Sequence, residues 1–311
     1  MCLRPRCCVS VALLLLTTAR PVVRAVDPQP VAFTTYDQVR IAADYYAPPP
    51  AERGAPMVIL LHMYQRDRSA WKPLIQPLHD AGFAILAIDL RGHGESGTEA
   101  HRQRVRRREP GVFEEMYQDV RAAYDFLAGQ PGVDRARFAL VGASVGCSVA
   151  LRYAVQDKSV DALVCLSPGT NYMGLDSRAD MREIKGRRIW LIAADHQGER
   201  EGVVELGPLG DGVETRLTAE SEHGTRLFGK VPDLERQIAE YLKQQVGAPT
   251  DTVVYGTINS NIYHLPGSDW IAEITPTNLR HYSSPEEAER RGLRRARSRG
   301  PGDQPSKRNE P

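Results

Sequence analysis

The pentapeptide GASVG at residues 142–146 constrains this chain more than any other feature. It follows an apolar run at 138–141 that predicts a buried strand, and it leads into a predicted helix at 146–153. A serine between two glycines at such a strand-to-helix turn is held in a strained conformation that exposes its hydroxyl. We therefore interpret Ser144 as a nucleophile; the alternative is a structural turn with a solvent-exposed serine.

A serine hydroxyl is a weak nucleophile unless a base accepts its proton. The sequence offers His223, in the segment SEHGT that follows a predicted strand at 213–218. Gly224 allows the loop to turn tightly toward the serine. The alternative is a histidine on an ordinary surface loop.

A carboxylate should orient the imidazole and stabilise its cation. We expect it after the predicted strand at 189–193, where Asp195 is the first carboxylate. Glu199 and Glu201 are the alternatives in the same loop.

The oxyanion of such a reaction needs two N–H donors. The first candidate is the amide of Val145, directly after the serine, and the second is the amide of Met63, after a predicted strand at 57–61. His62 beside it is expected to brace this loop rather than to act as a base.

The rest of the chain alternates strand and helix patterns, which predicts an α/β fold with a mostly parallel central sheet and helices on both faces. Residues 98–110 hold five arginines and two glutamates and are interpreted as an exposed loop. The predicted strands are 31–35, 39–45, 57–61, 83–90, 138–141, 162–166, 189–193 and 213–218, and the predicted helices are 71–81, 112–127, 146–153 and 233–246.

The chain divides into five predicted segments. Residues 1–25 have an early positive region and an apolar run of 11 residues, the pattern of a signal peptide; an uncleaved anchor is the alternative. The main α/β domain spans 26–246 and a linker spans 247–251. A small α+β domain is expected at 252–293 and a disordered basic tail at 294–311, which is rich in Lys, Arg, Gly and Pro.

Charge and cysteine content exclude several classes of protein. The 40 basic and 39 acidic residues give no overall bias toward nucleic acid, and 41% hydrophobic residues are ordinary for a folded domain. Removal of 1–25, which holds four arginines and no acidic residue, would change the net charge from +1 to −3. Cys147 and Cys165 would then be the two cysteines left, and we expect buried free thiols; a single bridge is the alternative.

These motifs resemble the α/β-hydrolase superfamily, and within it the bacterial dienelactone-hydrolase-like esterases. The matching stretches are LLHM at 60–63, AIDLRGHGES at 87–96, the GASVG turn and EHG at 222–224. The resemblance covers about residues 31–246 and implies an eight-stranded sheet and a triad of Ser144, Asp195 and His223. In that family the loop at 89–96 shapes the wall of the site and is not catalytic.

The sequence departs from this family at three places. Met63 stands where a glycine is usual, and Gln197 stands where the family more often has its carboxylate, which leaves Glu199 as a substitute for Asp195. About 20 residues separate the strands at 162–166 and 189–193, too few for the helical cap that many members insert there. An open site follows, which favours small or soluble esters.

The C-terminal segment resembles a small Ada-type metal-binding domain, in NSNIYHLPGS at 259–268 and YSSPEEAE at 282–289. In that family four cysteines hold one zinc ion. The corresponding positions fall near His264, Ser268, Ala296 and Arg299, which cannot supply a thiolate shell. We interpret the segment as a metal-free relic, and we expect no cofactor anywhere in the protein.

Together these patterns predict an exported serine hydrolase, periplasmic or secreted, that cleaves a carboxylic ester of a small molecule. The alternative is a catalytically weak or inactive binding protein on the same fold. We expect no specific nucleic-acid partner and, after leader removal, no transmembrane segment. The Arg-rich stretches at 102–108 and 290–308 could contact a polyanion or an envelope polymer, with solvated charge as the default interpretation.

Overall fold

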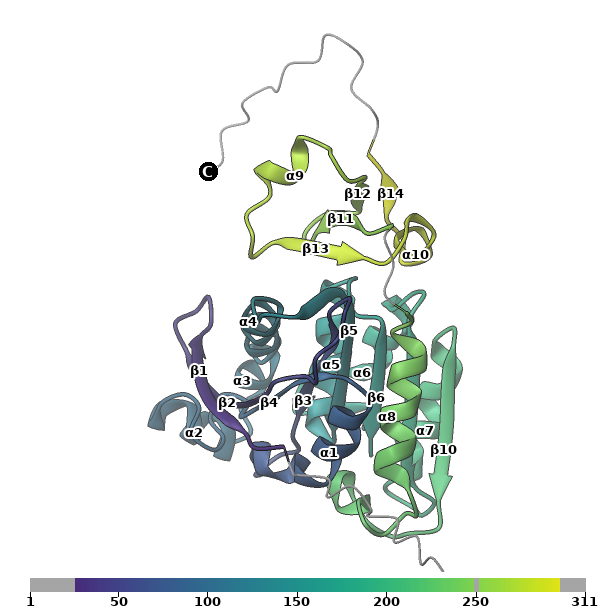
Figure 1. Cartoon of the computed structure of the whole chain (residues 1–311). Helices are drawn as coiled ribbons and strands as arrows, with labels where there is room; N and C mark the ends of the chain where they lie inside the picture. The colour runs from purple at the N-terminus through teal and green to yellow at the C-terminus, as the bar shows by residue number, and fades with distance from the viewer. Residues whose placement is uncertain (1–25, 249–251, 297–311) are drawn as a thin grey trace, which may run out of the picture.

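The computed structural model describes residues 26–248 and 252–296 (Figure 1). The predicted signal peptide at 1–25, most of the linker (249–251) and most of the basic tail (297–311) lie outside the described residues. Within the described part of the chain, no helix has the length and apolar character that crossing a bilayer requires.

An eight-stranded sheet forms the main domain, and it confirms the predicted fold class and strand number. Six of its strands are parallel, and the hairpin of the first two strands adds an antiparallel edge. In spatial order the strands are β1 (Gln29–Thr34), β2 (Arg40–Tyr46), β4 (Ala84–Ile88), β3 (Ala55–Leu61), β5 (Val133–Ala143), β6 (Ala162–Leu166), β9 (Arg188–Ala194) and β10 (Val213–Thr218).

The central strands are buried along their whole length because helices cover both faces of the sheet (Figure 1). This is why they read as continuous apolar runs rather than alternating patterns. One core lies under α1 (Lys72–Asp80) and α8 (Leu234–Gln245). The other lies under α3 (Pro110–Glu114), α4 (Tyr117–Ala128), α5 (Val145–Gln156), α6 (Ser177–Glu183) and α7 (Arg200–Leu206). Short 3₁₀ helices are η1 (Arg68–Trp71), η2 (Gly207–Leu209) and η3 (Gly224–Leu227).

The segment expected to be an exposed loop at 98–110 is largely helical. Helix α2 (Glu99–Arg106) begins at Thr98, whose side chain caps the amide of His101. The sequence did not predict this helix because most of its residues are charged or polar. Its few apolar residues, such as the buried Val105, give no clear helical periodicity. The helix predicted at 112–127 is two helices, α3 and α4, with a break at residues 115–116.

Cys147 and Cys165 are both buried and free, as predicted. Burial raises the pKa of the Cys147 thiol, whose Sγ donates to the carbonyl of Leu166. Neither thiol is available at the surface.

The C-terminal residues form a separate four-stranded sheet with its own small core. Its strands, in spatial order, are β13 (Leu279–Tyr282), β11 (Val254–Thr257), β12 (Ile262–His264) and β14 (Arg294–Arg295), and its helices are α9 (Trp270–Glu273) and α10 (Pro285–Arg290). Tyr263 and Tyr282 dominate the core. Strand β14 pairs with β12 just beyond residue 293, where we expected the tail to begin.

Two buried ion pairs join this small domain to the main domain. Arg280 donates from Nε to Asp157 at 2.6 Å, and Arg291 pairs with Asp161; all four side chains are almost inaccessible to solvent. Asp157 caps the C-terminal end of α5, so the small domain packs at the end of the strands that lies opposite to Ser144, with β13 beside β5 (Figure 1).

Candidate active site

Ser144 sits at the sharp turn between β5 and α5, with φ 53° and ψ −119°. Glycine is required on both sides. A Cβ on Gly146 would lie 2.1 Å from the carbonyl oxygen of Leu61, and one on Gly142 would lie 2.5 Å from that of Gly146. The turn therefore depends on backbone contacts that no larger residue allows, and it holds Ser144 in a region of φ that L-residues rarely adopt.

Backbone strain is concentrated around this serine. Among the described residues, seven other than glycine have a positive φ. Four of them, Gln65, Arg108, Ser144 and Met173, line a single pocket of about 640 Å³ that also includes His223. Strain of this kind persists where the surrounding structure imposes it, and it is typical of functional sites.

The loop that carries His223 packs directly against the turn of Ser144. Gly224 has a φ of +59°, and a Cβ there would lie 2.7 Å from Sδ of Met63 and 3.5 Å from Cβ of Ala143. Its amide donates to Oγ of Ser167 at 2.9 Å. The structure thus brings together Ser144, His223 and Met63, three residues selected from the sequence.

The carboxylate on His223 is Glu199. Its Oε1 lies 2.7 Å from Nδ1 of the imidazole, and the two side chains are mostly buried. Burial raises the pKa of Glu199, but the nearby His223 and Ser167 side chains outweigh this and lower it below its ordinary value. Glu199 is therefore an anion at neutral pH, placed to orient the ring and to stabilise its cation.

The expected triad acid, Asp195, is not the partner of His223. It is 47% exposed and pairs with Arg200 at 3.0 Å. Asp195 follows β9 as predicted. Its amide donates to the carbonyl of Thr218, which holds Asp195 at the end of the sheet. Glu201, the other alternative, accepts from the amide of Gly198 instead.

A tight turn explains the position of Glu199. Gly198 has a φ of +92°, and the amide of Glu199 donates to the carbonyl of His196. The chain therefore doubles back before α7 and returns Glu199 toward the site. Gly198 followed by the start of a helix is the sequence signal that favours Glu199 over Asp195.

The two expected oxyanion donors lie at this pocket as well, since Met63 and Val145 both line it. Val145 is the first residue of α5, where amides have no acceptor within the helix. The main chain after Met63 is held by the His62 side chain, whose Nδ1 donates to the Met63 carbonyl at 2.8 Å while Nε2 accepts from the amide of Leu90 at 3.0 Å. His62 braces the loop, as the sequence indicated.

A short hairpin, β7 (Asn171–Tyr172) and β8 (Leu175–Asp176), stands where related folds can insert a cap. Tyr172 and Met173 from this hairpin line the pocket. Burial raises the pKa of Tyr172, and a hydrogen bond with the Ser144 hydroxyl opposes part of that shift. The hairpin covers one side of the serine with an aromatic ring.

The loop at 89–96 is held in place by hydrogen bonds from main-chain amides and by an ion pair. Asp89 accepts from the amides of Arg68 and Glu95, each at 2.8 Å, and Arg91 donates from Nε to the buried Asp119, also at 2.8 Å. A Cβ on Gly94 would collide with the Asp89 carboxylate at 2.1 Å. Neither Asp89 nor Arg91 lines the pocket of Ser144, in keeping with a structural role.

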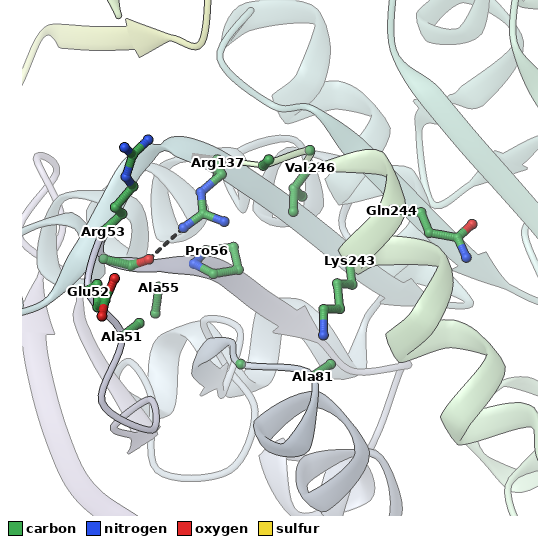
Figure 2. A pocket seen from close by; sticks show the side chains of 14 residues that line it. Ala51, Glu52, Arg53, Ala55, Pro56, Ala81, Arg137, Lys243, Gln244 and Val246 are labelled. Atoms are coloured by element: carbon green, nitrogen blue, oxygen red, sulfur yellow. Dashed lines mark hydrogen bonds between the residues drawn. The ribbon is translucent and has the colours of Figure 1, made fainter. Parts of the chain in front are cut away.

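A second, larger hollow of about 720 Å³ lies at the other end of the strands (Figure 2). It is bounded by the start of β3 and the end of α8, and Arg137 donates there to the carbonyl of Gly54. Its described lining residues include no serine, cysteine, threonine or histidine. The chemistry is therefore assigned to the smaller pocket around Ser144.

The small domain does not fit a zinc ion. Nδ1 of His264 lies 3.5 Å from Oγ of Ser268, and the amide of Ala296 donates to the neighbouring Tyr263, so these three positions are close together. One imidazole and one hydroxyl cannot form a tetrahedral zinc shell. Among the described residues no three His, Cys, Asp or Glu side chains form a metal-binding cluster; Arg299 lies outside them.

Buried His62 predicts a defined dependence of stability on pH. Burial lowers its pKa to about 4, so the unfolded chain binds a proton between pH 4 and 6.5 that the folded chain does not. The contribution of His62 is fully present above pH 6.5 and is lost as pH falls toward 4, by roughly 3 kcal/mol. We expect His62→Gln to lower the free energy of unfolding at pH 7 and to reduce the fall in that free energy between pH 6.5 and pH 4. Urea unfolding of the wild type and the variant at pH 7 and at pH 4 measures both effects. An unchanged difference between the two pH values would contradict this account.

A model of one hydrolase family, described as "Serine aminopeptidase, S33", matches residues 53–194. The match includes Ser144 and ends before Glu199 and His223. Two Mycobacterium tuberculosis strains have an uncharacterized protein that is 34% identical over 143 residues; the match covers 45% of this chain and 46% of that protein. The chain thus spans about half the length of these curated relatives.

A thiohydrolase from Aspergillus aculeatus is 25% identical over 210 residues, which cover 65% of this chain and 62% of that enzyme. Among solved structures, an esterase from Pyrococcus furiosus superposes with a TM-score of 0.57 at 21% identity, covering 71% of this chain and 92% of the esterase. The likeness to this solved structure shows that the chain has the α/β-hydrolase fold.

Proposed function

We propose that this protein is an exported serine hydrolase that cleaves the carboxylic ester of a small or soluble substrate through an acyl-enzyme intermediate. The observation that carries the proposal is the 2.7 Å contact between His223 and Glu199 at the pocket of the strained Ser144. Ser144 and His223 line one pocket, and Glu199 is joined to it through its contact with His223.

The geometry supports a two-step reaction. Because Nδ1 of His223 donates to Glu199, Nε2 is the basic nitrogen and takes the proton of Ser144 as its Oγ attacks the ester carbonyl. The amides of Met63 and Val145 would hold the oxyanion. Collapse of the tetrahedral intermediate breaks the C–O bond, and the imidazolium protonates the leaving alkoxide.

Water completes the cycle. His223 removes a proton from a water molecule, which attacks the acyl-enzyme, and Ser144 regains its proton as the acid leaves. Glu199 stays ionised throughout and stabilises the imidazolium twice, once in each step. The lowered pKa of Glu199 suits this role.

Features of the pocket and of the N-terminus support the substrate size and the export. The hairpin of Tyr172 and Met173 replaces a helical cap, which leaves the 640 Å³ pocket open to soluble esters. Residues 1–25 have the pattern of a leader. The similarity to a thiohydrolase and to an esterase is consistent with acyl transfer, which uses the same machinery for thioesters and esters.

The nucleophile is tested with a fluorophosphonate probe, which reacts with activated serines. The wild-type protein should be labelled on the peptide that contains Ser144, and Ser144→Ala should abolish labelling. Ser221→Ala is the matched control, because Ser221 is an exposed serine of the histidine loop and its loss should leave labelling intact. A folded wild-type protein that resists the probe would favour the inactive binding protein.

The orienting carboxylate is tested by a pair of matched substitutions. Glu199→Gln keeps the shape but removes the charge, and it should lower kcat by about 10³–10⁴-fold, as expected when the imidazole loses its orienting anion. Asp195→Asn removes a charge four residues away and should change kcat by less than about threefold. Hydrolysis of 4-nitrophenyl acetate measures both. The reverse ranking would return the role to Asp195.

A further inference from the structure

Three arginines line the active-site pocket, and no acidic residue does. Arg66, Arg108 and Arg226 stand on different loops around Ser144 and His223, and all three are exposed at the mouth. Among the described residues, Arg66 and Arg108 have no carboxylate partner, and the contact of Arg226 with Glu222 is long, at 3.6 Å. The entrance to the site therefore carries positive charge that the protein itself leaves uncompensated.

Neighbouring arginines behave differently. Arg102 pairs with Glu99 at 2.9 Å, and Arg104 pairs with Glu115 at 3.0 Å. These arginines of α2 are thus paired with carboxylates, within the helix or shortly after it. Arg108, just past its end, is the arginine of this segment that reaches the pocket.

The backbone of Arg108 carries a second, independent signal. Its φ is +55°, its amide donates to Val105 at 2.9 Å, and the next amide donates to Arg104 at 3.1 Å. This is the left-handed residue that ends a helix, a position that glycine normally occupies because a side chain there is strained. An arginine at a glycine position, with its side chain in the pocket, points to a use for that side chain.

The Arg108 side chain is also held in place. Its guanidinium lies 5.4 Å from the ring centre of Tyr64, which lines the same pocket. Stacking on an aromatic face leaves the edge of the guanidinium, with its N–H donors, free to bind a planar anion. Arg66, two residues after Tyr64 in the sequence, lines the same pocket.

We propose that the substrate carries an anionic oxygen group, a carboxylate or a phosphate, which Arg108 and Arg66 bind at the mouth while Ser144 attacks the ester carbonyl. The inference rests on the proposed function and narrows its substrate class. A charged hydrogen bond of this kind at a partly exposed site corresponds to roughly tenfold in kcat/KM.

The experiment compares anionic esters with neutral esters of the same size. For an anion on the acyl side, the pair is 4-nitrophenyl hydrogen succinate and 4-nitrophenyl butyrate. For an anion on the alcohol side, the pair is 4-acetoxybenzoate and its methyl ester. We expect the anionic member of at least one pair to have about tenfold higher kcat/KM, and the preference to shrink as salt is raised. Inhibition by succinate or by inorganic phosphate distinguishes the two anion types.

Matched variants assign the preference to Arg108. Arg108→Gln should remove it, whereas Arg107→Gln, which makes the same charge change one residue away and outside the pocket, should preserve it. Arg108→Gly should lose the preference and yet unfold at a higher urea concentration, because it relieves the positive φ. A surface arginine with no role would not show this combination, in which the preference for anionic esters falls while the stability of the protein rises.

The outcomes separate this inference from the proposed function. Equal turnover of both members of both pairs, or a preference that survives Arg108→Gln, overturns the anion site and leaves the serine hydrolase intact. If no ester is cleaved, the proposed function fails. Calorimetric binding of succinate or phosphate, lost in Arg108→Gln, then still supports the anion site, and no binding overturns it.

Discussion

The close approach of the first turn of α5 to the end of β3 is the contact on which the rest of the site depends. Only hydrogen fits between Gly146 and the carbonyl of Leu61, so helix and strand meet backbone to backbone. This approach places the amide of Val145 and the loop of Met63 at one pocket and gives Ser144 its unusual φ. The chemistry is thus set by packing of the main chain, with side chains added to it.

Those parts of the molecule that depend on local pattern were predictable from the sequence. The buried strands are continuous apolar runs, and the glycines around Ser144 and beside His223 mark turns that no other residue can make. The resemblance to known hydrolases supplied the order of the motifs. Helix α2 was missed because its stability comes from a cap and from ion pairs, which leave little hydrophobic periodicity.

The exchange of Asp195 for Glu199 illustrates what local pattern cannot resolve. Both residues lie in one loop, and counting residues from the strand end favours the first. Which carboxylate reaches His223 depends on the path of the chain from Asp195 to Glu199, which turns at Gly198 with its positive φ. It also depends on the ion pair of Asp195 with Arg200, which occupies the Asp195 carboxylate. The three-dimensional path of a loop decides which of its side chains reaches the site, and counting residues along the sequence does not reveal that path.

Helix α5 connects the active-site pocket at its N-terminal end with the small domain at its C-terminal end. Its first residue faces the pocket, and the aspartate that caps its last turn accepts from a buried arginine of the small domain. Asp157 has the low pKa of a paired acid, since Arg280 and its other hydrogen-bond partners outweigh the effect of burial. A chain cut before residue 252 would leave this carboxylate and Asp161 without their cations. Removing one partner of a buried ion pair is strongly destabilising, so the main domain depends on the small domain for part of its stability.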